Sequence, residues 1–266
     1  MAIKKVRKKK MRRYEMSKAL LEIRDLHVRI EDRTILNGID LTIKKGETHV
    51  LMGPNGTGKS TLVSTIMGDP TYEITGGQIL IDGKDITDEP ADVRAREGLF
   101  LSFQSPEEIP GVTVENFLRM AKSAREKRPI KILAFQRELQ KRMAELDMDP
   151  SYADRYLNVG FSGGEKKKTE ILQLLMLNPK LAMLDETDSG LDVDAVRVVS
   201  KGIQAYRDHD NAVLIITHNA KILEGMDIDY VHVLEDGKIG RTGGRELADE
   251  ILEKGFGELK ERDVVE

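Results

Sequence analysis

The segment Gly53–Thr61, GPNGTGKST, places glycines, a lysine and hydroxyl residues in one short stretch. It matches G-x-x-x-x-G-K-[ST], a pattern in which the backbone N–H groups of a glycine-rich loop surround phosphate oxygens. Lys59 is expected to reach the β- and γ-phosphates of a nucleotide, and the Ser60 hydroxyl to ligate Mg²⁺. The predicted nucleotide-binding residues of this loop are Gly53, Pro54, Asn55, Gly56, Thr57, Gly58, Lys59, Ser60 and Thr61.

Two carboxylates follow an apolar run later in the chain. The segment Leu181–Leu184 reads as a buried strand that ends at Asp185 and Glu186, where α/β sheets place their sites. Asp185 is expected to hold Mg²⁺ through water, and Glu186 to polarise an attacking water molecule. Gln104 and His218 each follow another apolar strand. We expect them at the same edge, with Gln104 near Mg²⁺ or the attacking water and His218 near the γ-phosphate.

A second glycine element, SGGE at Ser162–Glu165, satisfies the S-x-x-E capping box, so a plain helix start is one reading. A cap needs no glycine pair, however, and each glycine costs a helix about 1 kcal/mol. Bare backbone there would let an anion approach closely. The three lysines at 166–168 have the wrong sign for a helix N-terminus, which indicates a polyanion or acidic surface nearby. Two chains arranged head to tail would let each phosphate loop face its partner's glycine pair.

Strand and helix patterns show how these residues are positioned. Strands are expected at 20–30, 33–43 and 48–52, in a hairpin around Asp82–Gly83, and at 98–104, 180–186, 212–218 and 230–243. Helices dominate 105–177, where apolar residues form one helix face that ends before Asp149–Pro150. That face comprises Ile132, Phe135, Leu139, Met143 and Leu146. The expected layout is an α/β core at 19–104 and 178–266, a helical subdomain at 105–177 and a basic arm at 1–18.

Composition sets further bounds on function. The chain has 266 residues and no cysteine, which excludes disulfides, thiol catalysis and thiolate metal sites. No apolar run approaches the roughly 20 residues that span a bilayer, so we expect a cytoplasmic chain without direct membrane insertion. Residues 1–15 hold eight lysines and arginines against Glu15. This arm is consistent with a solvated tail or with binding to nucleic acid or an acidic surface, and Met16 would itself make a plausible start.

Six motifs occur in the order found in ABC-type ATPases, and the chain resembles that family over Gly53–His218. They are GPNGTGKST, Gln104, FSGGE, LAMLDE, SGLD at Ser189–Asp192, and His218. The resemblance implies an α/β P-loop NTPase fold of the ABC ATPase type, with a mixed sheet core, a helical subdomain carrying the signature motif and an N-terminal antiparallel β part. It implies ATP and Mg²⁺ as ligands. It also implies that Ser162, Gly163 and Gly164 close on the partner's γ-phosphate, while Asp192 crosses the interface.

Longer stretches over residues 19–260 resemble SufC-type ATPases, which serve SUF iron–sulfur cluster assembly. They are YEITGGQI, FQSPEEIPGVTV, NVGFSGGEKK, DETDSGLD and DYVHVLEDGKI. The resemblance implies a SufB-type scaffold as partner, with or without SufD, which an ATP-driven homodimer of this chain would remodel. The implied contact surface lies near Glu107–Val114. Lys168, Thr187 and the basic arm depart from the family pattern.

Two other functions fit parts of the sequence. An ABC importer's ATPase subunit would carry the same six motifs, but the wording of Asp185–Asp192 favours the SufC type. The chain also lacks an aromatic residue between Asp25 and Ile35, where transporter ATPases commonly stack adenine. A nucleic-acid-acting ABC protein would use the basic arm; nucleic acid is the less favoured partner.

Overall fold

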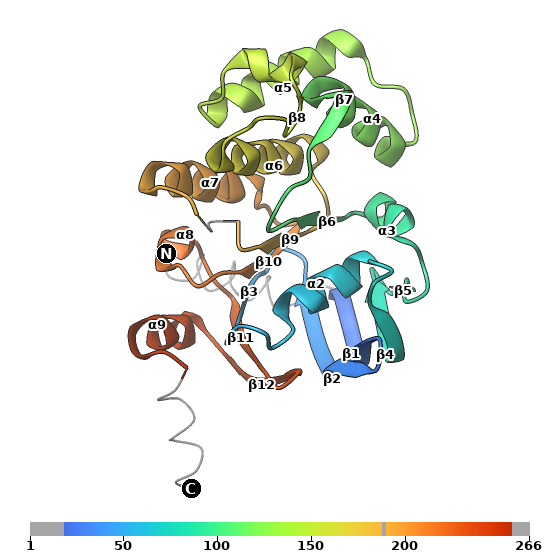
Figure 1. Cartoon of the computed structure of the whole chain (residues 1–266), viewed down its shortest axis with the longest axis vertical. Helices are drawn as coiled ribbons and strands as arrows, with labels where there is room; N and C mark the ends of the chain where they lie inside the picture. The colour runs from blue at the N-terminus through green and yellow to red at the C-terminus, as the bar shows by residue number, and fades with distance from the viewer. Residues whose placement is uncertain (1–18, 188–189, 257–266) are drawn as a thin grey trace, which may run out of the picture.

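A computed structural model describes residues 19–187 and 190–256 (Figure 1). The predicted basic arm, residues 1–18, lies outside the described residues. The centre of the molecule is a six-stranded sheet in the order β12-β11-β3-β10-β9-β6. Its strands are β3 (Thr48–Met52), β6 (Leu99–Ser102), β9 (Leu181–Asp185), β10 (Ala212–Ile216), β11 (Tyr230–Glu235) and β12 (Lys238–Gly243). All neighbours pair in parallel except β11 and β12, so the sheet is mixed.

A separate antiparallel sheet forms beside the core in the order β2-β1-β4-β5. Its strands are β1 (Ala19–Ile30), β2 (Arg33–Lys44), β4 (Glu73–Ile81) and β5 (Lys84–Asp85). The expected hairpin is present: β4 and β5 pair antiparallel on either side of Asp82 and Gly83. Both turn residues have positive φ, at 49° and 79°. Asp-Gly is favoured in such two-residue turns, whose backbone needs left-handed conformations.

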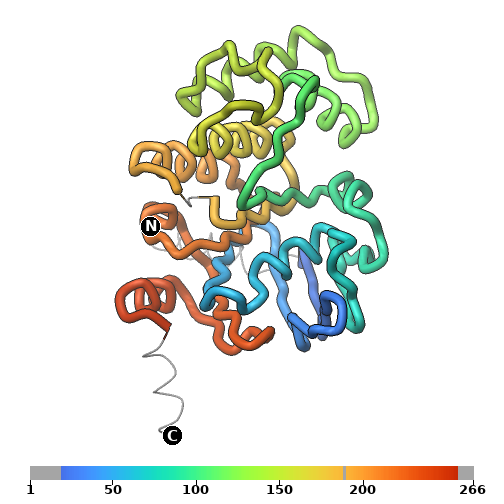
Figure 2. The backbone as a smooth tube through the Cα atoms, viewed as in Figure 1, coloured from blue at the N-terminus to red at the C-terminus, as the bar shows by residue number. Residues whose placement is uncertain are grey.

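Helices cover the core sheet and fill the segment between β6 and β9. They are α2 (Lys59–Met67), α3 (Ala91–Glu97), α4 (Val114–Glu126), α5 (Ile132–Glu145), η1 (Pro150–Asp154), α6 (Gly163–Leu177), α7 (Val193–Tyr206), α8 (Ala220–Leu223) and α9 (Arg245–Lys254). The chain leaves the core after β6, passes through α4 and α5 at the end of the molecule away from the antiparallel sheet, and returns through α6 (Figure 2). A small ladder of β7 (Ile109–Thr113) and β8 (Tyr156–Leu157) pins the two ends of this excursion together.

Alternation along the central strands produces two hydrophobic cores, one on each face of the sheet. On β9, Ala182 and Leu184 belong to the cluster that includes the inward faces of α4 to α7. Leu181 and Met183 belong instead to the cluster shared with α2 and the antiparallel sheet. Other elements cover both faces of the parallel strands, so all five residues of β9 are buried, including Asp185.

One residue of the predicted apolar helix face is exposed. Phe135, Leu139, Met143 and Leu146 are buried as expected, but Ile132 is 57% exposed. Ile132 is the first residue of α5, so it lies at the end of the apolar face, where its side chain stays largely exposed. The helical periodicity alone could not show where the covering neighbour stops.

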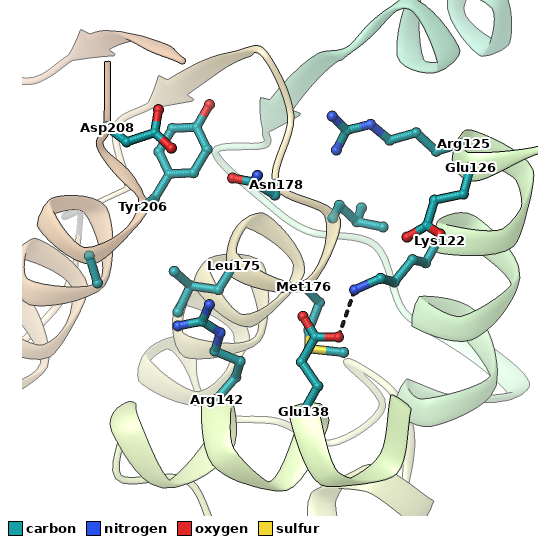
Figure 3. Close-up of a pocket in the computed structure, with 12 residues that line it drawn as sticks. Lys122, Arg125, Glu126, Glu138, Arg142, Leu175, Met176, Asn178, Tyr206 and Asp208 are labelled. Carbon is teal, nitrogen blue, oxygen red and sulfur yellow. Dashed lines mark hydrogen bonds and ion pairs between the residues drawn. The ribbon is translucent and has the colours of Figure 1, made fainter. Parts of the chain in front are cut away.

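An open pocket of about 520 Å³ lies where α4 and α5 meet the C-terminal ends of α6 and α7 (Figure 3). Lys122 and Glu138, 2.7 Å apart, join α4 to α5 across it. Both basic and acidic side chains line its wall, including Arg125, Glu126 and Arg142. None of the predicted nucleotide-site residues lines this pocket.

The packing of α7 on α6 depends on a glycine. A Cβ at Gly202 would lie 2.3 Å from Ile171 Cγ2 and 3.2 Å from Leu146 Cδ2. In an open helix Gly→Ala would stabilise by about 1 kcal/mol, but overpacking a core costs about 1–3 kcal/mol. We therefore expect Gly202→Ala to lower the free energy of unfolding, by up to about 2 kcal/mol, in denaturant titrations. In Gly163→Ala the new methyl would meet nothing within 4 Å, and it should not destabilise the fold.

Candidate active site

The phosphate loop joins β3 to α2, and its glycines are needed for different reasons. A Cβ at Gly53 would lie 2.2 Å from the Leu234 carbonyl oxygen on β11. One at Gly58, the N-cap of α2, would lie 2.7 Å from Leu36 Cδ2. At Gly56 there is open space, but φ is +81°, which L-residues adopt at a cost. The loop is thus held against two sheets while its exposed middle stays free to meet a ligand.

Lys59 is folded onto this loop. Its Nζ donates to the carbonyl oxygens of Gly53 and Pro54 at 2.8 and 2.9 Å. Burial lowers the pKa of Lys59, and the carboxylates of Glu186 and Asp185 oppose that shift. The ammonium group therefore lies within electrostatic reach of both carboxylates at the end of β9. A bound phosphate would offer stronger, charge-assisted partners than the two carbonyl groups.

Asp185, the last residue of β9, is buried beside the phosphate loop. Burial raises the pKa of its carboxyl group, and a hydrogen bond from the Ser60 hydroxyl lowers it. Its Oδ1 atom is buried without a hydrogen-bond partner. A buried, unpaired carboxylate oxygen next to a hydroxyl is costly unless a cation or water meets it. Oxygen ligands of this kind suit Mg²⁺, so the predicted pair of Ser60 and Asp185 fits this ion.

Glu186, Gln104 and His218 come together at the same edge. The Gln104 Nε2 atom donates to Glu186 Oε2 at 2.7 Å, and His218 Nε2 lies 3.8 Å from Glu186 Oε1. The Glu186 side chain is 23% exposed, so water can reach it. The structure thus places both predicted neighbours around one carboxylate. Their predicted contacts with water, Mg²⁺ and the γ-phosphate remain predictions.

The sheet register accounts for this meeting. Ser102 at the end of β6 pairs with Leu184, and Asp185 pairs with Ile216 at the end of β10. Gln104 and His218 follow these strand ends by the same two residues, on either side of β9. The backbone N–H of Glu186 donates to the Ile216 carbonyl oxygen at 3.0 Å, one residue beyond the ladder.

The signature element forms the N-terminus of α6 as a complete capping box. The Ser162 hydroxyl accepts from the Glu165 N–H at 3.3 Å, and the Glu165 carboxylate accepts from the Ser162 N–H at 2.7 Å. A Cβ at Gly163 would meet nothing within 4 Å, and one at Gly164 would meet only Ala195 Cβ, at 3.9 Å. The chain's own fold therefore requires neither glycine.

The three lysines of α6 correct one interpretation. Their charge was expected to meet a polyanion or an acidic surface, but each has a partner within the chain. Lys166 pairs with Glu108 at 3.1 Å, and Lys168 donates to the Asp147 carbonyl oxygen at 3.1 Å. Lys167 is buried and pairs with Glu170. The long side chains reach away from the helix N-terminus to neighbouring segments, so they are not evidence for an external anion.

The sequence reading missed a group that holds the signature element in place. The Tyr152 hydroxyl donates to the Glu165 carboxylate of the capping box. The Arg155 guanidinium lies 4.3 Å from the centre of the Tyr152 ring and 4.5 Å from that of Phe161, an arrangement typical of cation–π contacts. Nothing in the spacing of these residues indicated the contact.

Asp192 is the N-cap of α7, where its carboxylate accepts from the Ala195 N–H at 2.8 Å. The predicted interface role of Asp192 stays a prediction. Of the SGLD motif, Ser189 lies outside the described residues. Within the described part of the chain, no helix is long and apolar enough to cross a membrane.

Comparisons with known proteins place this site in a family. The family model described as ABC transporter matches residues 36–189. The chain is 51% identical to Vegetative protein 296 of Bacillus subtilis, over 92% of this chain and 95% of that protein. It is 46% identical to the probable ATP-dependent transporter slr0075 of Synechocystis, over 93% and 98%. The probable ATP-dependent transporter ycf16 of Cyanophora paradoxa is 44% identical, over 92% and 96%.

Solved structures confirm the fold class. An ATP-binding cassette of an ABC transporter in its ADP conformation, MJ1267, superposes with a TM-score of 0.73 at 24% identity, covering 94% of this chain and all of that one. The shared fold is the ABC cassette, with a mixed sheet, an antiparallel sheet and helices. ABC ATPases work as dimers with partner subunits. The chain belongs to the ABC transporter ATP-binding family, and within it is an ABC-type ATPase of the SufC type.

Proposed function

We propose that this chain is the ATP-hydrolysing subunit of a cytoplasmic iron–sulfur cluster assembly complex. In this proposal, two copies close head to tail on ATP and thereby remodel a SufB-type scaffold, with or without SufD. Membership of the SufC type supports the assignment to cluster assembly. Because the chain has no cysteine, the scaffold would hold the cluster.

The observation that carries the head-to-tail dimer is the glycine pair of α6. A Cβ at Gly163 would enter open space, one at Gly164 would meet only Ala195 Cβ at 3.9 Å, and Ser162 is exposed. Glycine weakens a helix by about 1 kcal/mol at each position, so a pair that the fold does not need is explained by a ligand from outside. A helix N-terminus with bare backbone suits a phosphate. The γ-phosphate of ATP held by the partner's phosphate loop would be that ligand.

Hydrolysis would use the residues gathered at the carboxyl end of the sheet. Lys59 leaves the Gly53 and Pro54 carbonyl oxygens and contacts the β- and γ-phosphates. Ser60 and Asp185 would hold Mg²⁺, which when bound neutralises charge developing on the phosphates. Glu186 orients and polarises the attacking water. Gln104 would move from Glu186 toward Mg²⁺ or the attacking water, and His218 would hydrogen-bond the γ-phosphate.

The proposed scaffold contact lies on the segment that follows Gln104. Ile109 on β7 is 37% exposed and Tyr156 on the paired strand β8 is 50% exposed. Ile109 pairs with Leu157 and Tyr156 with Thr113, so both exposed side chains belong to one small ladder that a partner could cover. Asn158 ties this segment to the signature element, since its Nδ2 donates to the Glu107 carbonyl oxygen at 2.8 Å. A partner bound to this segment would contact a surface connected to Gln104 on one side and, through Asn158, to the signature element on the other.

A second candidate function is the ATPase subunit of an importer. It is favoured by relatives named probable ABC transporter ATP-binding proteins in Streptococcus pyogenes, which are 52% identical over 90% of this chain and 94% of those proteins. That function would use the same ATP site with a membrane permease as partner.

We expect Glu186→Gln to keep ATP binding but to lower turnover by about 10²-fold or more, because the amide cannot accept a proton from water. The ATP-bound dimer should then accumulate, as measured by light scattering. Glu253→Gln, at an exposed position of α9, is the matched control and should change neither property. Normal turnover in Glu186→Gln would remove Glu186 from its role.

Lys59→Ala should weaken ATP binding by about tenfold or more and abolish hydrolysis, because the charge that meets the phosphates is lost. Titration calorimetry with ATP measures the first effect. Thermal unfolding without nucleotide shows whether the loop stays folded. A Lys59→Ala chain that binds and hydrolyses ATP normally would contradict the proposed phosphate site.

Affinity capture of the tagged chain from native cells distinguishes the two functions. We expect a cysteine-containing scaffold without membrane spans, and Ile109→Glu with Tyr156→Glu should lose it. Leu133→Glu is the matched control, since Leu133 is 73% exposed but belongs to α5 and not to the β7–β8 ladder. Capture of a permease would overturn the assembly function in favour of the importer.

A further inference from the structure

A buried ion pair on α6 grips the backbone of another segment. Lys167 and Glu170 lie one helical turn apart, with side chains only 5% and 4% exposed. Their charged atoms, Lys167 Nζ and Glu170 Oε2, are 3.0 Å apart. The pair lies beneath the exposed start of α6, and no predicted step of ATP hydrolysis uses it directly.

Both charged groups also bind one residue, Phe103. The Lys167 Nζ donates to the Phe103 carbonyl oxygen at 2.6 Å. The Phe103 N–H donates to Glu170 Oε1 at 2.8 Å. Two side chains of α6 thus satisfy the donor and the acceptor of a residue that has just left strand β6. In a sheet these groups would belong to a neighbouring strand.

Burying two charged groups costs free energy, so filling space in the core is a poor explanation for Lys167 and Glu170. Taking both charges out of water is expensive, and apolar residues of similar volume often serve stability equally well. Burial raises the pKa of Glu170, and the nearby Lys167 ammonium opposes that shift. Buried pairs of this kind are best explained where they fix one geometry among several.

Phe103 is immediately followed by Gln104, the residue that donates to Glu186. Its own ring is not the reason for the grip, since the Phe103 side chain is 58% exposed. Fixing the Phe103 backbone restricts where the Gln104 side chain can reach. It also ties that side chain to α6, whose first residues form the signature element.

We propose that Lys167 and Glu170 are positioning residues for ATP hydrolysis, which clamp the Phe103 backbone so that Gln104 and the signature helix move as one unit. The clamp joins the ATP site of one chain to the surface that the same chain offers its partner's ATP. This inference rests on the proposed roles of Gln104, Glu186 and the signature element.

A tryptophan at position 103 reports on the clamp without relying on activity. The chain has no tryptophan, so Phe103→Trp supplies a single fluorophore on the clamped residue. In that background, Lys167→Met should lower the fluorescence anisotropy and reduce kcat about tenfold or more, because small displacements of positioning groups are costly. The KM for ATP should stay within twofold, since the phosphate loop is untouched. Lys167→Arg, which keeps a charged donor, should restore most of both signals.

Lys168→Met is the matched control, because Lys168 is the next residue of α6 and its partner is the Asp147 carbonyl oxygen. It should leave kcat and the anisotropy unchanged. If Lys167→Met leaves Glu170 unpaired and fails to fold, Lys167→Met combined with Glu170→Met removes both charges together, and the same losses are expected.

The proposal is overturned if Lys167→Met, or Lys167→Met with Glu170→Met, folds cooperatively and keeps the fluorescence anisotropy of the Phe103→Trp protein together with a kcat within twofold of it. Failure of the proposed ATP site looks different. Normal turnover in Glu186→Gln would remove the roles of Glu186 and Gln104, while the anisotropy at position 103 would still report whether Lys167 holds that backbone.

Discussion

The register of the parallel strands is the constraint on which the site depends. Leu51, Ile216 and Asp185 lie side by side across β3, β10 and β9. The phosphate loop and the two carboxylates therefore follow their strands at the same level of the sheet. Side chains alternate between faces along a strand, so a slip of one residue would exchange the orientations of Asp185 and Glu186. The buried apolar residues on both faces of β9 resist such a slip, because every one of them would change core. Packing far from the nucleotide therefore fixes the geometry at the phosphates.

Much of this architecture is readable from the sequence, because strands and phosphate loop obey local rules. The apolar runs, the Asp82–Gly83 turn and the common edge of Gln104 and His218 follow from period, turn chemistry and strand direction. Contacts set by tertiary packing do not. Ile132 continues a helical period but is largely exposed at the helix end, and the lysines of α6 find their partners within the chain. The close approach of Gly53 to β11 is equally invisible, since Leu234 is distant in the chain.

Helix α6 serves the proposed mechanism from two sides. Its first turn presents Ser162 and bare glycine backbone outward, and the capping box with Tyr152 keeps that turn in one conformation. In its second and third turns, Lys167 and Glu170 bind the backbone of Phe103, the residue before Gln104. Segment 107–113, which includes β7, is attached to the same helix through Lys166 and Glu108. A partner that shifts this loop would therefore act on a rigid body carrying parts of two ATP sites.

The backbone at Glu186 bears on how this chain can change over evolutionary time. Its φ of +45° lies in the left-handed region, where glycine or asparagine would be more comfortable than glutamate. The side chain that the proposed mechanism assigns to the attacking water thus occupies a position that folding alone would give to another residue. Selection for stability alone would favour glycine or asparagine at this position, so a homologue that no longer hydrolyses ATP is expected to lose the proposed catalytic carboxylate and gain stability.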